Sequence, residues 1–233
     1  MMNRIISFKK FMFLTATMFL VFTGSGIAQT LSGDFRTLEQ LEDRSEDIYM
    51  KIYSILSDYP DFSYKYVYNN GKITDVEING VENQVVKSRL KVLLYDLKKN
   101  KKAMLGLPSR TGIYYSVDKE PEPKNGYRAF YEQLNNNLVY PQDAKDAGVE
   151  GTVYVKFVVN ANGEIPYAVG SEDIKSPFDN YVNDMKKEAV KAVKATSGDW
   201  QPGMVNGVAV STWVVIPVYF NFKKNPTLPA LIR

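Results

Sequence analysis

Apolar and polar residues alternate with the periods of helices and strands along most of this chain. Apolar residues three and four positions apart predict amphipathic helices, and strict alternation predicts strands with one buried face. In the first half, Asn69-Asn70-Gly71 lies between two alternating runs, which predicts a β-hairpin. The elements expected there are a helix over 34–57, strands over 62–68 and 73–78, a helix over 82–99 and a strand over 113–117.

The second half predicts a similar order of elements. Tyr140-Pro141 ends its first helix, because proline disfavours helical geometry in the residue before it. The run from Val208 to Phe222 keeps a period of two and predicts one long strand. The expected elements are helices over 127–138 and 142–147, strands over 153–159 and 164–169, a helix over 179–194, a loop over 198–207 and a strand over 208–222.

A polar segment separates the two halves. Residues 118–126 contain Pro121, Pro123 and several charged residues, a composition typical of a linker. The predicted fold class is therefore α+β, with two small two-layer domains that each pack a short antiparallel sheet against helices. The expected domains are an N-terminal α+β module of unknown role over 29–117, the linker over 118–126, a second domain over 127–222 and a tail over 223–233.

The first 28 residues have the pattern of an export signal. Basic residues precede an apolar run from Phe11 to Phe22, and Gly26 and Ala28 are placed as in a cleavage site. The run is shorter than the ~20 apolar residues that cross a bilayer as a helix. We therefore predict a signal peptide over 1–28, cut after Ala28, and a periplasmic protein. An uncleaved N-terminus that anchors the chain to the inner membrane is the alternative, and it is the one case in which we expect membrane contact.

Composition narrows the classes of function. The chain has no cysteine and no histidine, which excludes disulfides, thiol catalysis, imidazole triads and the usual zinc sites. Its formal net charge is +3, and Arg4, Lys9 and Lys10 of the predicted signal account for all of it. A neutral mature chain is a poor partner for nucleic acid. The sequence therefore predicts a binding protein that is not an enzyme, with no cofactor and no metal site.

The last predicted strand indicates an open sheet edge. A strand over 208–222 would be longer than its neighbours, so part of it should lack a partner within the monomer. Pro217 has no N–H group, so its side of the strand cannot lie in a regular ladder. Because N–H groups alternate between the two edges, Ser211, Trp213 and Val215 should face the same open side. We expect this edge to bind an added strand, with Trp213 helping to select the partner.

A resemblance to a known family points the same way. The segment YPQDAKDAGVEGTVYVKFVVNANGEI, followed by DWQPGMVNGVAVSTWVVIPVYFNF, resembles the C-terminal domain of TonB, the energy transducer of outer-membrane transport in Gram-negative bacteria. The resemblance covers about residues 127–222. It implies that the last strand pairs with an extended peptide at the N-terminus of a receptor plug. The predicted partner-binding residues are Ser211, Trp213, Val215, Pro217, Tyr140 and Pro141. A packing role is the alternative for Trp213, and a role in ending a helix is the alternative for Tyr140 and Pro141.

The chain also departs from that family. The transducer has a membrane anchor with a functional histidine and a long proline-rich spacer, whereas this chain has no histidine and a short hinge. The predicted function is that of a periplasmic TonB-like protein that binds a peptide of an outer-membrane receptor or envelope partner by β-strand addition and supports TonB-dependent transport. The alternative is an envelope scaffold that forms a homodimer through its last strand and has no transport role.

Overall fold

A computed structural model describes residues 27–59, 61–172 and 179–222. The predicted tail over 223–233 and nearly all of the predicted signal peptide lie outside these residues. Residues 1–34 and 35–233 form two units, and the fold below is that of the second. Among the helices of the described ranges, none is both long and apolar enough to span a membrane.

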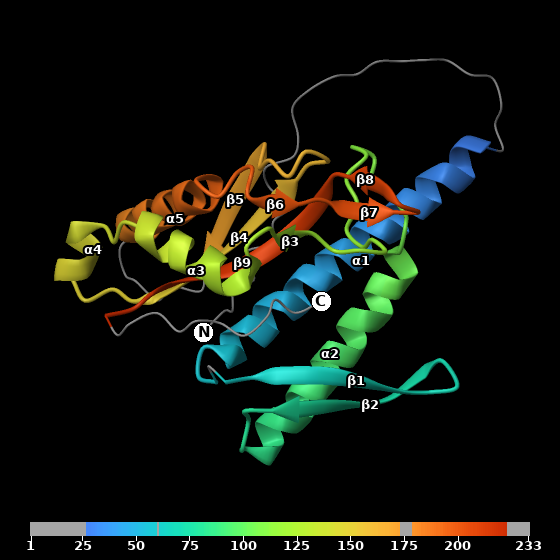
Figure 1. Cartoon of the computed structure of the whole chain (residues 1–233), viewed down its shortest axis with the longest axis horizontal. Helices are drawn as coiled ribbons and strands as arrows, with labels where there is room; N and C mark the ends of the chain where they lie inside the picture. The colour runs from blue at the N-terminus through green and yellow to red at the C-terminus, as the bar shows by residue number, and fades with distance from the viewer. Residues whose placement is uncertain (1–26, 60, 173–178, 223–233) are drawn as a thin grey trace. The chain divides into compact units, whose positions relative to one another are not determined.

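The first half forms a helix, a hairpin and a second helix, as predicted (Figure 1). The hairpin turns at Asn70 and Gly71, whose positive φ angles confirm the predicted turn. Asn83 caps the second helix, because its side chain accepts hydrogen bonds from the amides of Val85 and Val86. These elements are α1 (Ile27–Leu56), β1 (Ser63–Asn69), β2 (Lys72–Asn79) and α2 (Gln84–Met104). The strand expected over 113–117 is reduced to isolated bridges at Tyr114.

The second half adds helices and short antiparallel strands, so the α+β fold class is confirmed. The helices predicted over 127–138, 142–147 and 179–194 are present, as is the strand over 153–159, whereas the following strand begins only at Tyr167. The elements are β3 (Glu122–Pro123), α3 (Gly126–Asn137), α4 (Gln142–Asp146), β4 (Gly151–Val159), β5 (Tyr167–Glu172), α5 (Asp179–Lys194), β6 (Trp200–Gln201), β7 (Gly203–Val205), β8 (Val208–Val210) and β9 (Thr212–Phe220).

The prediction of one long final strand is wrong. The chain breaks at Ser211 into β8 and β9, and β8 pairs with β7 in a hairpin inside the region predicted as a loop. The close packing of Thr212 on Gly203 accompanies this break, since a Cβ atom at Gly203 would lie 2.2 Å from the Thr212 hydroxyl oxygen. The first part of the alternating run therefore has a partner within the chain.

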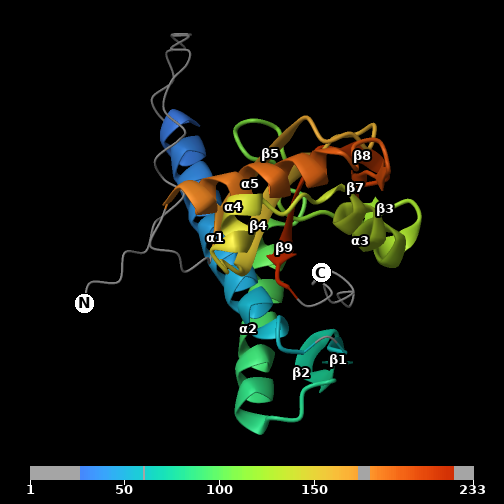
Figure 2. The same cartoon turned by 90° about the vertical axis from the view of Figure 1, so that its left-hand side faces the viewer.

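The central sheet has the strand order β5-β4-β9, which leaves β9 at an edge. Helices α3 and α5 cover one face, where Trp200 packs edge-to-face on Phe130 and Phe157 with ring centroids 5.1 and 5.3 Å apart. Helix α1 covers the other face, where the rings of Tyr53 and Tyr154 stack 6.4 Å apart. Both views show α1 running beside β9 (Figures 1 and 2).

One buried apolar cluster includes residues of both halves. Ile52 and Leu94 from the first half and Phe157 and Ile216 from the second are all fully buried members of it. The predicted linker also packs against its surroundings, since Pro121 and Pro123 are buried and β3 pairs with β6. Residues 35–233 thus form one compact unit. That the two halves fold as separate domains stays a prediction.

Gly163 provides a test of how the sheet is joined to the turn before β6. Its φ is +80°, and a Cβ atom there would lie 2.0 Å from the Trp200 carbonyl oxygen. We expect Gly163→Ala to lower the free energy of unfolding by about 3 kcal/mol, through the left-handed backbone and the clash together. Gly148→Ala is the matched control, because Gly148 also has positive φ but no atom within 4 Å of the added Cβ. It should cost about 1 kcal/mol. Urea denaturation measures both, and equal losses would show that the contact with Trp200 does not matter.

Candidate functional site

The candidate site is the outer edge of β9, the side that faces away from β4. Here the Ser211 carbonyl accepts a hydrogen bond from the Tyr114 amide, and the Trp213 amide donates to the Tyr114 carbonyl, both at 2.9 Å. Backbone groups two residues apart in a strand point to the same edge. Ser211 and Trp213 therefore both face outward, toward a segment of the first half.

Val215 and Pro217 continue this edge. The Val215 carbonyl accepts a hydrogen bond of 3.3 Å from the Tyr53 hydroxyl of α1. Pro217 lies opposite Tyr154 of β4, and its position two residues after Val215 turns its missing N–H side outward. The ladder between β4 and β9 thus loses no donor to the proline. Four of the six predicted partner-binding residues lie together along one strand edge.

The edge that was expected to be open is partly covered by the same chain. Tyr114 forms a one-residue parallel bridge to Thr212, and Tyr53 reaches the next outward carbonyl. Unpaired strand edges attract other chains, and proteins protect them by covering them with a helix or a loop. In this protein the first half provides both kinds of cover, a contribution that the sequence patterns did not predict.

Trp213 belongs to a cluster of aromatic and charged side chains beside the edge. The Lys156 ammonium of β4 lies 4.5 Å from the Trp213 ring centroid and 5.5 Å from that of Tyr115. Tyr167 of β5 packs edge-to-face on Trp213, with the ring centroids 5.8 Å apart. Such geometry is typical of cation–π contacts, which are stronger where water is excluded. Trp213 is therefore held between two strands of the sheet and the Tyr115 segment.

An ion pair joins this cluster to α1. The Lys156 ammonium pairs with the Glu46 carboxylate, and the two side chains are only 16% and 9% exposed. Burial raises the pKa of Glu46, while Lys156 opposes the shift. Burial also raises the pKa of the nearby Glu42 to about 7, against the attraction of Lys156 and with the help of repulsion from Glu46. Three ionisable groups thus lie between α1 and the sheet, and the Lys156 ammonium attracts the carboxyl groups of both Glu42 and Glu46.

A second buried ion pair fixes the segment that follows Tyr114 and Tyr115. The ammonium of Lys101, near the end of α2, lies 2.5 Å from the Glu120 carboxylate and 3.5 Å from the Tyr49 hydroxyl oxygen. Burial alone would lower the pKa of Lys101, but Tyr49 and Glu120 raise it above its ordinary value. The predicted linker is therefore tied to both long helices by charge as well as by packing.

Tyr140 and Pro141, the other two predicted site residues, lie near the far end of β9. The Tyr140 ring stacks on Phe222 and packs edge-to-face on Phe220, at 5.5 and 5.3 Å between centroids. Its hydroxyl donates a 2.5 Å hydrogen bond to the Val149 carbonyl. Pro141 precedes the first turn of α4. The structure therefore gives Tyr140 a packing role and separates this pair from the Trp213 cluster.

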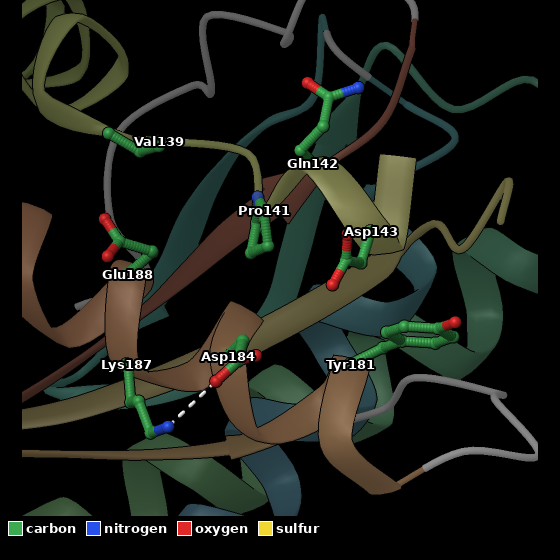
Figure 3. Close-up of a pocket in the computed structure, with 8 residues that line it drawn as sticks. All are labelled: Val139, Pro141, Gln142, Asp143, Tyr181, Asp184, Lys187 and Glu188. Carbon is green, nitrogen blue, oxygen red and sulfur yellow. Dashed lines mark hydrogen bonds and ion pairs between the residues drawn. The ribbon is translucent and has the colours of Figure 1, made fainter. Parts of the chain in front are cut away.

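A cavity of about 330 Å³ lies beside Pro141, between α4 and α5 (Figure 3). Carboxylates of Asp143, Asp184 and Glu188 line it, and the Lys187 ammonium forms an ion pair with Asp184 at 2.8 Å. All of these polar groups are on short or exposed helical turns. The cavity therefore resembles a solvated cleft between two helices, and we do not assign chemistry to it.

Sequence patterns missed Tyr53, Tyr114, Glu46 and Lys156. One signal was present, because Lys156 interrupts the otherwise apolar run of β4 and a charge in a strand buried on both faces requires a partner. Another was the spacing of Glu42, Glu46, Tyr49 and Tyr53 along one side of α1. Neither signal tells which segments of the chain meet.

The buried ion pair predicts a large effect of removing its cation. Lys156→Met should lower the free energy of unfolding by about 3 kcal/mol, because it leaves the buried Glu46 carboxylate unpaired. Adding Glu46→Leu should recover most of that loss. Lys187→Met is the control, since Lys187 pairs with Asp184 on the exposed surface and should cost less than about 1 kcal/mol. Denaturant unfolding measures all four proteins. A single variant as stable as the control would contradict a buried pair.

Glu42 predicts a dependence of stability on pH. Its pKa is higher in the folded chain, at about 7, than its ordinary value of 4.5. The stability contributed by the neutral carboxyl is therefore complete below the lower value and lost as pH rises to the higher one. Glu42→Gln should be more stable than the unmodified chain at pH 8 by about 1 kcal/mol, a figure reduced because the side chain is half-buried.

Urea denaturation at about pH 4 and about pH 8 checks the Glu42 prediction, since the two values lie on either side of the interval in which the folded and unfolded proton affinities differ. Glu82→Gln, at an exposed position two residues before α2, is the control and should change the stability little at either pH. If Glu42→Gln is more stable than the unmodified chain only at about pH 4, or at neither pH, the burial of this carboxyl between α1 and the sheet is contradicted.

Comparison with known proteins finds similarity in the second half of the chain. Two solution structures of the TonB C-terminal domain of Helicobacter pylori are similar to this chain, at 19% and 20% identity. Each match covers 41% of this chain and 78% or 92% of the other, with a TM-score of 0.31. No curated protein matches the chain. Residues 136–222 match the family described as Gram-negative bacterial TonB protein C-terminal. The matched residues, which contain β4, β5, α5 and β9, are similar to the TonB C-terminal family.

Proposed function

We propose that this protein is a periplasmic TonB-like protein that binds an extended peptide of an outer-membrane receptor, or of another envelope partner, through the outer edge of β9. The bound peptide adds a strand to the β5-β4-β9 sheet. Backbone hydrogen bonds along Ser211, Trp213 and Val215 provide affinity, and side chains near Trp213 select the partner. Through this contact the protein supports TonB-dependent transport.

The observation that carries this proposal is the bridge between Tyr114 and β9. Two backbone hydrogen bonds of 2.9 Å join Tyr114 to Ser211 and Trp213, in the parallel pattern of an added strand. The outward backbone groups of Ser211 and Trp213 are thus oriented to pair with an extended segment, as they already do with Tyr114. Pro217 limits the ladder on its own side, so we place the contact at the Ser211–Val215 end of β9.

Two further observations support a binding role in the envelope. The match of residues 136–222 to the TonB C-terminal family favours an interaction domain of outer-membrane transport. The pattern of residues 1–28 favours export, as argued above. Near the site, the buried charges of Glu46 and Lys156 neutralise each other across the contact between α1 and the sheet. This arrangement favours a structural role for these charges over a catalytic one.

A proline at Val215 tests the proposal. Val215→Pro removes one outward N–H group and leaves the β4 ladder intact, because Val215 and Pro217 point to the same edge. Fluorescence anisotropy with labelled synthetic peptides, taken from the plug N-termini of the host's outer-membrane receptors, measures binding to the full chain. We expect the variant to bind about tenfold more weakly, which is the loss of affinity typical of removing one hydrogen bond between uncharged groups. Val92→Ala, on the exposed side of α2, is the control and should bind unchanged.

Equal binding by Val215→Pro and the unmodified chain, with circular dichroism showing both folded, would contradict the edge assignment. Sedimentation of the full chain separates the alternative function. A concentration-dependent dimer that is lost in Val215→Pro, together with no binding of any receptor peptide, would favour the envelope scaffold.

A further inference from the structure

The segment around Tyr114 is held on β9 in the way that a bound peptide would be. Its backbone donates to Ser211 and accepts from Trp213, and its neighbour Tyr115 is buried with its ring near the Lys156 ammonium. The Trp213 ring centroid lies 4.5 Å from the same ammonium. The segment therefore uses both the backbone edge and the side-chain cluster that we assign to partner binding.

The hold on this segment is weak compared with the ladder on the other side of β9. Strands β4 and β9 pair continuously from Gly151 opposite Phe220 to Val159 opposite Thr212. The segment contributes one bridged residue to β9, and it follows a turn closed by hydrogen bonds between Ser109 and Ile113 and between Gly112 and Ser109. A short segment that pairs with a strand at one residue opens locally at less cost than the strands of a core.

Tyr115 also fits its place imperfectly. Its ring is buried, yet within the described part of the chain its hydroxyl has no hydrogen-bond partner. A buried polar group without a partner costs free energy that an apolar ring would not. A competing segment with phenylalanine at this position would avoid that cost and would therefore bind the edge more tightly than residues 113–115.

We propose that residues 113–115 are an internal ligand of the β9 edge, which a partner must displace, and that they define the segment the edge accepts. That segment is extended, runs parallel to β9 at the bridge, and places an aromatic ring next to Lys156 one residue after the bridging position. This inference rests on the proposed function for its physiological partner. The claim that residues 113–115 occupy the β9 edge and can leave it needs no partner and concerns this chain alone.

The occupancy has a defined consequence for affinity. A partner binds only the fraction of molecules in which the edge is free, so the observed dissociation constant rises in inverse proportion to that fraction. The Tyr53 hydroxyl adds a further bond at Val215, which the same partner must replace. Changes that release residues 113–115 therefore strengthen partner binding without touching β9.

The chain's own segment is the probe for this inference. A fluorescent peptide with the sequence of residues 109–119 is titrated into the full chain carrying Tyr114→Pro, which removes the amide that donates to Ser211. We expect about tenfold tighter binding than to the unmodified chain, in which the edge is occupied. Tyr114→Phe keeps the backbone amide and serves as the matched control, with binding like that of the unmodified chain.

Peptide variants test the defined chemistry. A peptide with Tyr114→Pro should not bind the opened chain, Tyr115→Ala should bind more weakly, and Tyr115→Phe should bind at least as well as the parent peptide. Equal binding of the parent peptide to the opened and unmodified chains would overturn the inference. So would equal binding of all four peptides.

Hydrogen exchange of the unmodified chain is a second test that does not depend on whether Tyr114→Pro folds. The Trp213 amide, bonded to Tyr114, should exchange about 100-fold faster than the Ile216 amide, which faces β4. Equal rates would mean that the segment leaves only on global unfolding. If receptor peptides bind while these tests fail, the proposed function stands without an internal ligand. If the tests succeed and no receptor peptide binds, the internal ligand stands and the proposed function fails.

Discussion

The rest of the structure depends on one requirement, that the β5-β4-β9 sheet be covered on both faces. Strand β4 places Phe157 toward α3 and α5 and Tyr154 toward α1, and both side chains are fully or nearly fully buried. A sheet that is apolar on both sides cannot leave either face in water without losing most of its hydrophobic stabilisation. The part of helix α1 from Phe35 onward therefore belongs to the same compact unit as β4, β5 and β9.

The same requirement explains why buried charges lie between α1 and the sheet. Because α1 lies on the sheet, Lys156 of β4 is largely removed from water, and it forms an ion pair with Glu46 of the helix. The ion pair joins α1 to the sheet, as does the hydrogen bond from the Tyr53 hydroxyl to the Val215 carbonyl. The rings of Tyr115 and Trp213 both lie near the same ammonium. Stability of the fold and access to the binding edge are thus controlled by neighbouring contacts, so a change in one affects the other.

Local patterns predicted most helices and strands. Apolar residues spaced by four, such as Ile48 and Ile52, or by two, such as Val153 and Val155, are the ones that the fold buries. The outward orientation of Ser211 and Val215 follows from strand geometry alone. The break at Ser211 was missed because period two continues through it, and because the β7–β8 hairpin is accompanied by the close packing of Thr212 on Gly203. The cover on β9 was missed because it joins residues far apart in the sequence, with Tyr114 about a hundred positions before Ser211 and Tyr53 lying 162 positions before Val215. Local patterns do not predict contacts between such distant segments.

The most direct test of the account is an NMR titration of the full chain with a synthetic plug peptide of an outer-membrane receptor, read at every backbone amide. Strand addition at β9 predicts the largest shift changes at Ser211, Trp213 and Val215, together with the indole of Trp213 and the released amide of Tyr114. Changes confined to the β1–β2 hairpin and α2, with β9 unaffected at saturation, would contradict the assignment of this edge as the binding site.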